Sequence, residues 1–446
     1  LALSAWKQFG NARWSLRCNP SSGNLHPTET YLIASGVEGM DDGVYHYRAD
    51  EHGLEQRCRL QAEHVAQKPL LLLAFSSVHW REAWKYGERA FRYCQLDTGH
   101  ALGAVNYAAA TLGWRLIPHY EVGDGQLATL LGLDRDDDFG SAERESPELL
   151  LQLSPGVAGA QDIPALLSAA SAGSWTGQAN VLDPRHFYEW PVIDEVASVA
   201  TRPTGAEKLP CQWGSLPSPA SFAGSDRAAD LFRRRRSAQA FDGSTEITKA
   251  NFYRLLDHLL PRAGQAPWEG LPWNPSVHLV LFVHRVEGLA PGLYALPRRR
   301  EVIPQLKAAM REEFIWESVS EAPEHLPFFQ LVGARAEKAA AQLSCHQPIA
   351  ADSAFSLGML VEFGQCTGEQ PWRYRELFWE AGAVGQALYL EAEASGLSGT
   401  GIGCFFDDGV HQLLGISDKS FQSFYHFTVG GPLYDNRIIG LPPYRR

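Results

Sequence analysis

The chain has 446 residues, of which 45% are apolar, and its formal net charge is −12. The length allows two domains, and the apolar fraction is sufficient to bury a sizeable core. The acidic balance excludes a general nucleic-acid binder, because neutralising phosphates requires a basic face. No apolar run approaches the ~20 residues that a membrane span needs.

Seven cysteines are present, and no two of them have CxxC spacing. An odd number without that spacing favours reduced thiols over a disulfide framework or a structural zinc site. No secretory signal is visible at the start, so we expect a cytoplasmic protein. No cluster of His, Cys and carboxylate residues has the spacing of metal ligands, so we expect no metal. The chain opens at Leu1 in the middle of a pattern, and we therefore expect further residues upstream.

The first informative segment is the loop 19–27, which reads Asn-Pro-Ser-Ser-Gly-Asn-Leu-His-Pro and precedes a strand expected over 29–35. Two prolines bracket hydroxyls, an amide and free backbone N–H groups. Such a loop can hold the edge of a polar heterocycle or a ribityl chain. The same residue types are also typical of an ordinary turn.

Two long helices are expected over 97–113 and 380–396, because both stretches are Ala-rich and free of Pro. Gly113 and Gly396 would end them, since glycine is a common stop after a helix. A second buried strand is expected over 278–284, from its β-branched and aromatic residues.

The sequence repeats itself. Residues 37–45 recur as residues 286–294 at an offset of 249, and the acidic Asp97 recurs as Glu380 at an offset of 283. Two offsets that each hold over several positions indicate a duplication with one insertion. We expect domain one at 1–155, a linker rich in small residues and Pro at 156–221, and domain two at 222–446. Other pairs at the second offset are Arg92 with Arg375, Gly99 with Gly382, and Gly113 with Gly396.

Four motifs of the first repeat together resemble the nitroreductase superfamily, and most of all its SagB-type branch, which includes the azoline dehydrogenases of peptide natural-product pathways. They are Pro-Ser-Ser-Gly-Asn at 20–24, Pro-x-Glu-x-Tyr at 27–31, Gly-Val-Tyr-x-Tyr at 43–47, and Trp-Lys-Tyr-Gly-Glu-Arg-Ala-Phe-Arg-Tyr at 84–93. The resemblance implies an α+β fold in which a central antiparallel sheet is flanked by helices. It also implies FMN bound at a two-fold interface, here between two tandem domains that form an intrachain pseudo-dimer.

The two halves retain different parts of the family's flavin site. Domain one keeps the Ser-containing loop, which domain two replaces with residues 269–273. It has Pro118-His119-Tyr120 where domain two has glycines, so only domain two is expected to offer free glycine backbone N–H groups there. The resemblance therefore implies one composite FMN site and a mirror site that is empty or repurposed. The expected FMN ligands are Pro20, Ser21, Ser22 and Asn24 from domain one, with Arg235, Arg236, Ser237, Gln239, Gly401, Ile402, Gly403 and Arg437 from domain two.

One of these residues departs from the family's pattern, and the arginine run allows another interpretation. Gln239 stands where the family has a second Arg. The arginine run 233–236 is, without the resemblance, more typical of a solvated helix face than of a phosphate site, although guanidinium groups bind phosphate well.

Lys85 and Tyr86 match the pair that azoline dehydrogenases use for proton removal. A Lys can act as a base where burial or a neighbouring cation lowers its pKa. The alternative is a surface Lys beside a packing Tyr. We expect an FMN-dependent oxidoreductase that acts by hydride transfer on a small molecule or peptide, with NAD(P)H as one candidate electron donor. The alternatives are a catalytically degenerate scaffold that binds a peptide, and an enzyme that consumes FMN.

Overall fold

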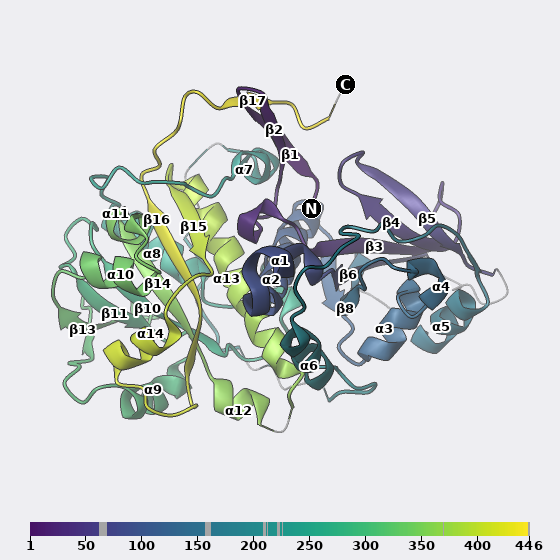
Figure 1. Ribbon diagram of the computed structural model, residues 1–446. Helices are drawn as coiled ribbons and strands as arrows, with labels where there is room; N and C mark the ends of the chain where they lie inside the picture. Colours follow the sequence, from purple (N-terminus) through teal and green to yellow (C-terminus); the bar gives the residue numbers. More distant parts are fainter. Residues whose placement is uncertain are drawn as a thin grey trace.

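The computed structural model describes residues 1–61, 69–156, 162–207, 211, 213–220, 224, 226–368 and 370–444. Two lobes lie side by side, one coloured mostly purple to blue and the other mostly teal-green to yellow, and two long helices run between them (Figure 1). Each lobe contains an antiparallel sheet with helices packed on it, so the expected α+β fold is confirmed.

The first lobe is built on a seven-stranded sheet in the order β7-β8-β6-β3-β4-β5-β9, whose pairs are all antiparallel. The strand expected over 29–35 is the central β3, and its apolar side chains pack in the core of this lobe. The strands are β3 (Thr28–Ser35), β4 (Gly43–Arg48), β5 (Gly53–Arg59), β6 (Leu70–Ser77), β7 (Arg115–Pro118), β8 (Ser146–Ser154) and β9 (Ser174–Trp175).

The second lobe has a sheet of the same size in the order β12-β13-β11-β10-β14-β16-β15, again antiparallel throughout. The strand expected over 278–284 is β10, and every residue of it is buried. The strands are β10 (Val277–Val283), β11 (Gly292–Leu296), β12 (Glu317–Ser318), β13 (Phe329–Gly333), β14 (Phe355–Val361), β15 (Ser398–Ile402) and β16 (Gln422–Gly430).

The expected long helices are α2 (Ala90–Thr111) and α13 (Arg373–Ala394), and they pack against each other between the lobes. Gly99 and Gly382, which correspond in the repeat, meet where the helices cross. A Cβ atom on Gly99 would lie 2.9 Å from the Cα of Gly382, so only glycine permits this approach. Gly113 and Gly396 follow the helix ends with φ values of +69° and +73°, as expected of stop glycines.

A third sheet joins the two ends of the chain. The hairpin of β1 (Leu3–Phe9) and β2 (Ala12–Arg17) pairs along β1 with β17 (Ile439–Leu441), and the three strands lie above the long helices in Figure 1. The remaining helices are α1 (Trp80–Tyr86), α3 (Asp124–Leu131), α4 (Asp136–Phe139), α5 (Ile163–Ser171), α6 (Pro191–Val199), α7 (Ala228–Arg234), α8 (Lys249–His258), α9 (Ile303–Ala309), α10 (Glu337–Leu343), α11 (Pro348–Asp352), α12 (Phe363–Thr367) and α14 (Asp407–Leu414).

The structure bears on the expectations for the segment 156–221 and for the cysteines. The segment 156–221 contributes α5, β9 and α6, so much of it packs on the first lobe. The expectation that all cysteines are reduced thiols is wrong for Cys345 and Cys404, which form a disulfide with their Cα atoms 5.9 Å apart. The cysteine pattern therefore no longer supports a reducing, cytoplasmic location. None of the helices in the described part of the chain has the length and apolar character needed to cross a bilayer.

Candidate functional site

The Ser-containing loop leads into the central strand β3. Its residues Ser22–Asn24 form a single 3-10 turn, in which Gly23 and Asn24 have φ values of 59° and 61°. The Ser21 hydroxyl accepts the backbone N–H of His26 at 2.8 Å, and the Asn24 amide donates to the carbonyl of Ser15 at 2.8 Å. These bonds fix the loop before any ligand arrives.

A cavity of about 530 Å³ lies between this loop and the second lobe. That size is within the range of ~300–1,000 Å³ of small-molecule sites. Seven of the twelve expected FMN ligands line the cavity: Pro20, Ser21, Asn24, Arg235, Arg236, Ser237 and Gln239. The structure thus brings the loop of the first repeat and the arginine segment of the second to one space.

Arg235 connects the two repeats directly. Its guanidinium is buried and donates to the carbonyl of Cys18 at 2.9 Å. It also lies 4.9 Å from the ring centre of Tyr389. Its Nη1 has no hydrogen-bond partner among the described residues, which leaves a buried cationic donor for an anion. Arg236 follows at the cavity wall, with its Nη1 donating to the carbonyls of Arg233 and Arg235.

The expected glycine turn 399–403 belongs to strand β15 and does not line the cavity. Ile402 packs in the core of the second lobe. The backbone N–H of Gly401 donates to the hydroxyl of Tyr389 at 2.9 Å, and a side chain on Gly403 would meet the ring of Tyr93. These glycines permit close packing of aromatic rings, whereas free backbone N–H groups were expected.

Two further expected ligands lie at the margin. Ser22 lies within the loop, beside residues that line the cavity. Arg437 has 75% of its side chain exposed and pairs with Asp435 at 2.7 Å, while its neighbours Asn436 and Ile438 line the cavity.

Lys85 and Tyr86 end helix α1 and lie against the loop. A Cβ atom on Gly23 would be 2.8 Å from Lys85 Nζ and 2.6 Å from Tyr86 Oη, so this glycine makes room for the pair. The Tyr86 ring meets that of Tyr93 edge-on, with 4.9 Å between centroids. Burial raises the pKa of Tyr86, so its hydroxyl stays protonated at neutral pH. The counterparts in the second repeat are Gly368 and position 369, and the latter lies outside the described residues.

Sequence reasoning did not assign a role at this site to several residues. Asn19 lines the cavity with an unpartnered, buried Oδ1. Glu82 and Asp97 are buried carboxyl groups near Ser21. Glu82 lies three residues before Lys85 on the same helix, and that spacing was the available signal.

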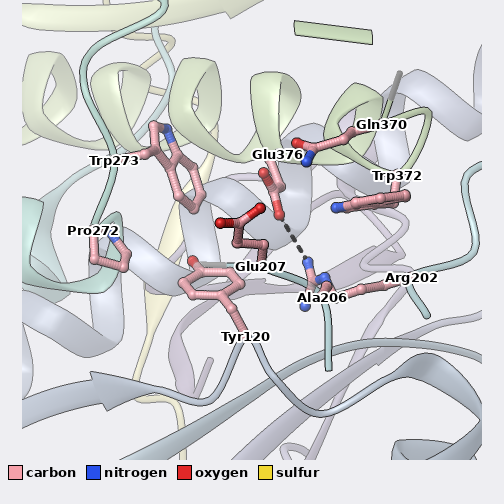
Figure 2. A pocket seen from close by; sticks show the side chains of 9 residues that line it. All are labelled: Tyr120, Arg202, Ala206, Glu207, Pro272, Trp273, Gln370, Trp372 and Glu376. Carbon is pink, nitrogen blue, oxygen red and sulfur yellow. Dashed lines mark hydrogen bonds and ion pairs between the residues drawn. The ribbon is translucent and has the colours of Figure 1, made fainter. Parts of the chain in front are cut away.

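In the opposite half, the equivalent of the serine loop borders a much smaller space (Figure 2). By the repeat offsets, Tyr120 corresponds to Gly403, Trp273 to Asn24 and Glu376 to Tyr93. These three line a cavity of about 20 Å³, which holds little more than one water molecule. Arg202, from the segment between the repeats, enters the space and pairs with Glu376 at 3.2 Å.

Arg202→Ala is expected to lower the free energy of unfolding by about 1.5–3 kcal/mol, because the buried carboxylate of Glu376 loses its hydrogen bond from Arg202 and keeps Arg373 at 3.7 Å. The Arg202 guanidinium also lies 5.0 Å from the ring of Tyr120 and 5.2 Å from that of Trp379, and these contacts would be lost. Urea denaturation measures the change. Arg227→Ala, which removes an exposed arginine paired with Asp230, is the control and should leave the free energy of unfolding nearly unchanged. Equal costs for both variants would contradict this assignment.

No group of three or more potential metal ligands occurs in the part of the chain that the structure describes.

Comparison with known proteins concerns the family and the fold. Residues 232–431, which lie in the second repeat, match the model of the Nitroreductase family. A "putative nitroreductase" of Methanocaldococcus jannaschii is 29% identical over 105 residues, which are 21% of this chain and 52% of that protein. The trifolitoxin-processing protein TfxB of Rhizobium leguminosarum is 29% identical over 136 residues, which are 26% of this chain and 35% of that protein. The chain therefore spans about half or less of the length of these relatives.

A crystal structure of "a putative nitroreductase" from Anabaena variabilis superposes on 97% of this chain and 86% of its own, with a TM-score of 0.68 at 22% identity. That likeness shows that the nitroreductase-like fold extends over both lobes.

Proposed function

We propose that the chain is an FMN-dependent oxidoreductase of the SagB type, with one flavin site between two tandem nitroreductase-like domains at about 1–155 and 222–446. The observation that carries the proposal is the 530 Å³ cavity, which the serine loop of one repeat and the arginine segment of the other line together. In the second repeat, residues 269–273 stand in place of the serine loop.

The residues at the cavity fit FMN. The phosphate requires cationic donors, and the unpartnered Nη1 of buried Arg235, with Arg236 beside it, supplies them. The ribityl hydroxyls and the ring edge require neutral polar groups, and Ser21, Asn24 and Gln239 supply those. Arg437, beside the cavity residue Asn436, would reach the phosphate from the rim.

Bound FMN would supply hydride transfer, and the chain would supply positioning and proton exchange. Lys85 would exchange a proton with the substrate, and Tyr86, whose raised pKa keeps its hydroxyl protonated, would donate a hydrogen bond. Gly23 leaves room for both side chains beside the loop that lines the cavity.

For the substrate we propose an azoline-like or peptide molecule that is dehydrogenated, because the Lys-Tyr pair favours proton removal over simple nitro reduction. The relation to TfxB, whose name describes processing of trifolitoxin, supports a peptide. NAD(P)H-driven reduction of a nitro or quinone compound is the second candidate, favoured by the family match. Anaerobic mixing of the oxidised, FMN-bound protein with each class of compound distinguishes the two candidates. An azoline-like substrate donates electrons and bleaches the flavin absorbance, whereas a nitro or quinone compound accepts electrons and leaves it unchanged.

We expect one FMN per chain after reconstitution, because Arg202 and Trp273 fill the corresponding space of the other half. Flavin absorbance of the released cofactor against protein concentration gives the ratio. A ratio of two would refute the asymmetric arrangement. A chain that rejects added FMN would instead support a peptide-binding scaffold, and oxygen-dependent loss of reduced FMN would indicate an FMN-consuming enzyme.

A further inference from the structure

Two carboxyl groups are buried beneath the serine loop without a cation bonded to them. Glu82 on α1 is fully buried, and neither of its oxygens has a hydrogen-bond partner among the described residues. Asp97 on α2 is 3% exposed, and its Oδ2 is likewise unpartnered. An isolated buried carboxylate is costly, so such groups keep a proton instead of a charge.

The two groups are connected to the candidate site through one side chain. Ser21, which lines the cavity, neighbours both carboxyl groups, and its hydroxyl opposes the effect of burial on the pKa of Glu82 and of Asp97. Glu82 and Lys85 are three residues apart on α1, so they are neighbours along the helix, with Glu82 on its buried side and Lys85 exposed.

Burial is the largest influence on both groups. It raises the pKa of Glu82, and the neighbouring Asp97 raises it further, against smaller opposite effects of Lys85 and Ser21. Burial also raises the pKa of Asp97, against Ser21, the backbone of Ser22 and Arg17. The titratable and charged groups that face the pair are Lys85 and Tyr86 of α1, Tyr93 and Cys94 of α2, Arg17 of β2 and Tyr425 of β16.

The second repeat provides an internal comparison. Glu380, the counterpart of Asp97, pairs with Arg298 and accepts the indole N–H of Trp273 at 3.1 Å. At the position of Arg298 the first repeat has Ala49, so there the counter-cation is missing.

The partner of Asp97 is also specific to the first repeat. Glu82 corresponds to Gln365, which cannot hold a titratable proton. The unpaired carboxyl pair thus occurs in the first repeat, which carries Lys85 and Tyr86. The second repeat has neither the carboxyl pair nor the Lys-Tyr pair.

We propose that Glu82 and Asp97 share a proton and act as the proton store of the site, exchanging that proton with Lys85 through Ser21. This rests on the proposed function. When a substrate is dehydrogenated, one C–H bond breaks and its electron pair leaves as hydride to FMN. A second hydrogen leaves the substrate as a proton to Lys85, a double bond forms, and the proton passes on to the ionised carboxyl of the pair. Reduction of a substrate runs the same transfers in reverse. Glu82 and Asp97 act through Lys85 and are positioning residues.

The test is the pH dependence of the two-electron potential of FMN bound to the full chain, measured from about pH 5 to pH 10. If the carboxyl pair exchanges its proton with the flavin site, the plot of potential against pH for the wild type changes slope at the pH where the pair titrates. Glu82→Gln should abolish that change, and Asp97→Asn should displace it by at least about one pH unit. Glu88→Gln, which removes an exposed carboxyl beside α1, is the matched control and should follow the wild type.

The outcomes separate the two proposals. A chain that binds no FMN defeats the proposed function together with this inference. A chain that binds FMN and gives parallel curves for wild type, Glu82→Gln and Glu88→Gln defeats the proton store alone. Infrared titration of the wild-type protein requires no variant to fold. It should detect a protonated carboxyl that ionises above neutral pH, and its absence would overturn the inference.

Discussion

Lys85→Ala is expected to slow oxidation of an azoline-containing peptide by about 10²–10⁴-fold, which is the usual contribution of a positioned acid or base. The FMN content should not change, because Lys85 is not among the residues that line the cavity. Single-turnover bleaching of the flavin under anaerobic conditions measures the chemical step. It separates this step from peptide binding and from product release.

Two variants check the assignment. Tyr86→Phe keeps the ring that packs edge-on against Tyr93 and removes the hydroxyl, so it should retain FMN and lose part of the rate. Lys419→Ala removes an exposed lysine of the second lobe and should leave the rate unchanged. A Lys85→Ala protein that bleaches as fast as the wild type would return Lys85 to the role of a surface residue.

Arg236→Ala is expected to weaken FMN binding by about 10- to 100-fold, which corresponds to the loss of charge-assisted hydrogen bonds worth about 1.5–3 kcal/mol. Riboflavin, which lacks the phosphate, should bind the variant and the wild type equally well. Quenching of flavin fluorescence during titration gives both affinities. The comparison of FMN with riboflavin is decisive, because general damage to the cavity would weaken the binding of both ligands.

Arg233→Ala is the matched control for this prediction. Arg233 belongs to the same arginine run, but 58% of its side chain is exposed and it pairs with Asp230. It should bind FMN normally. If Arg233→Ala and Arg236→Ala lose affinity alike, the run acts only through its overall charge, and the phosphate assignment of Arg236 is wrong.

The sequence predicted those features that depend on local pattern. The long helices and their stop glycines followed from composition, and the repeat offsets anticipated that Gly99 and Gly382 are equivalent before they were seen to meet. The prediction that the loop at Ser21 and Arg236 lie at one cavity came from the different motifs that the two halves retain.

The remaining features depend on tertiary contacts that no spacing reveals. Gly401 was expected to offer a free N–H, yet it gives way to the ring of Tyr425 and bonds Tyr389. Cys345 and Cys404 are 59 residues apart and meet only because the segments after α10 and after β15 are neighbours, where the N–H of Phe406 donates to the carbonyl of Leu343. The burial of Arg202 could not be expected from its Pro- and Ser-rich surroundings, since a buried guanidinium depends on distant partners.

The side chain of Arg202 in the space opposite the cavity has a consequence for how such a protein can change over generations. In a symmetric homodimer each substitution falls on both subunits, so an arginine that blocks one flavin site blocks the other as well. Here each half is encoded separately, and a loss on one side is not copied to the other. One half can therefore replace its cavity with packed side chains and add to the stability of the molecule. Selection for chemistry then acts on the other half alone.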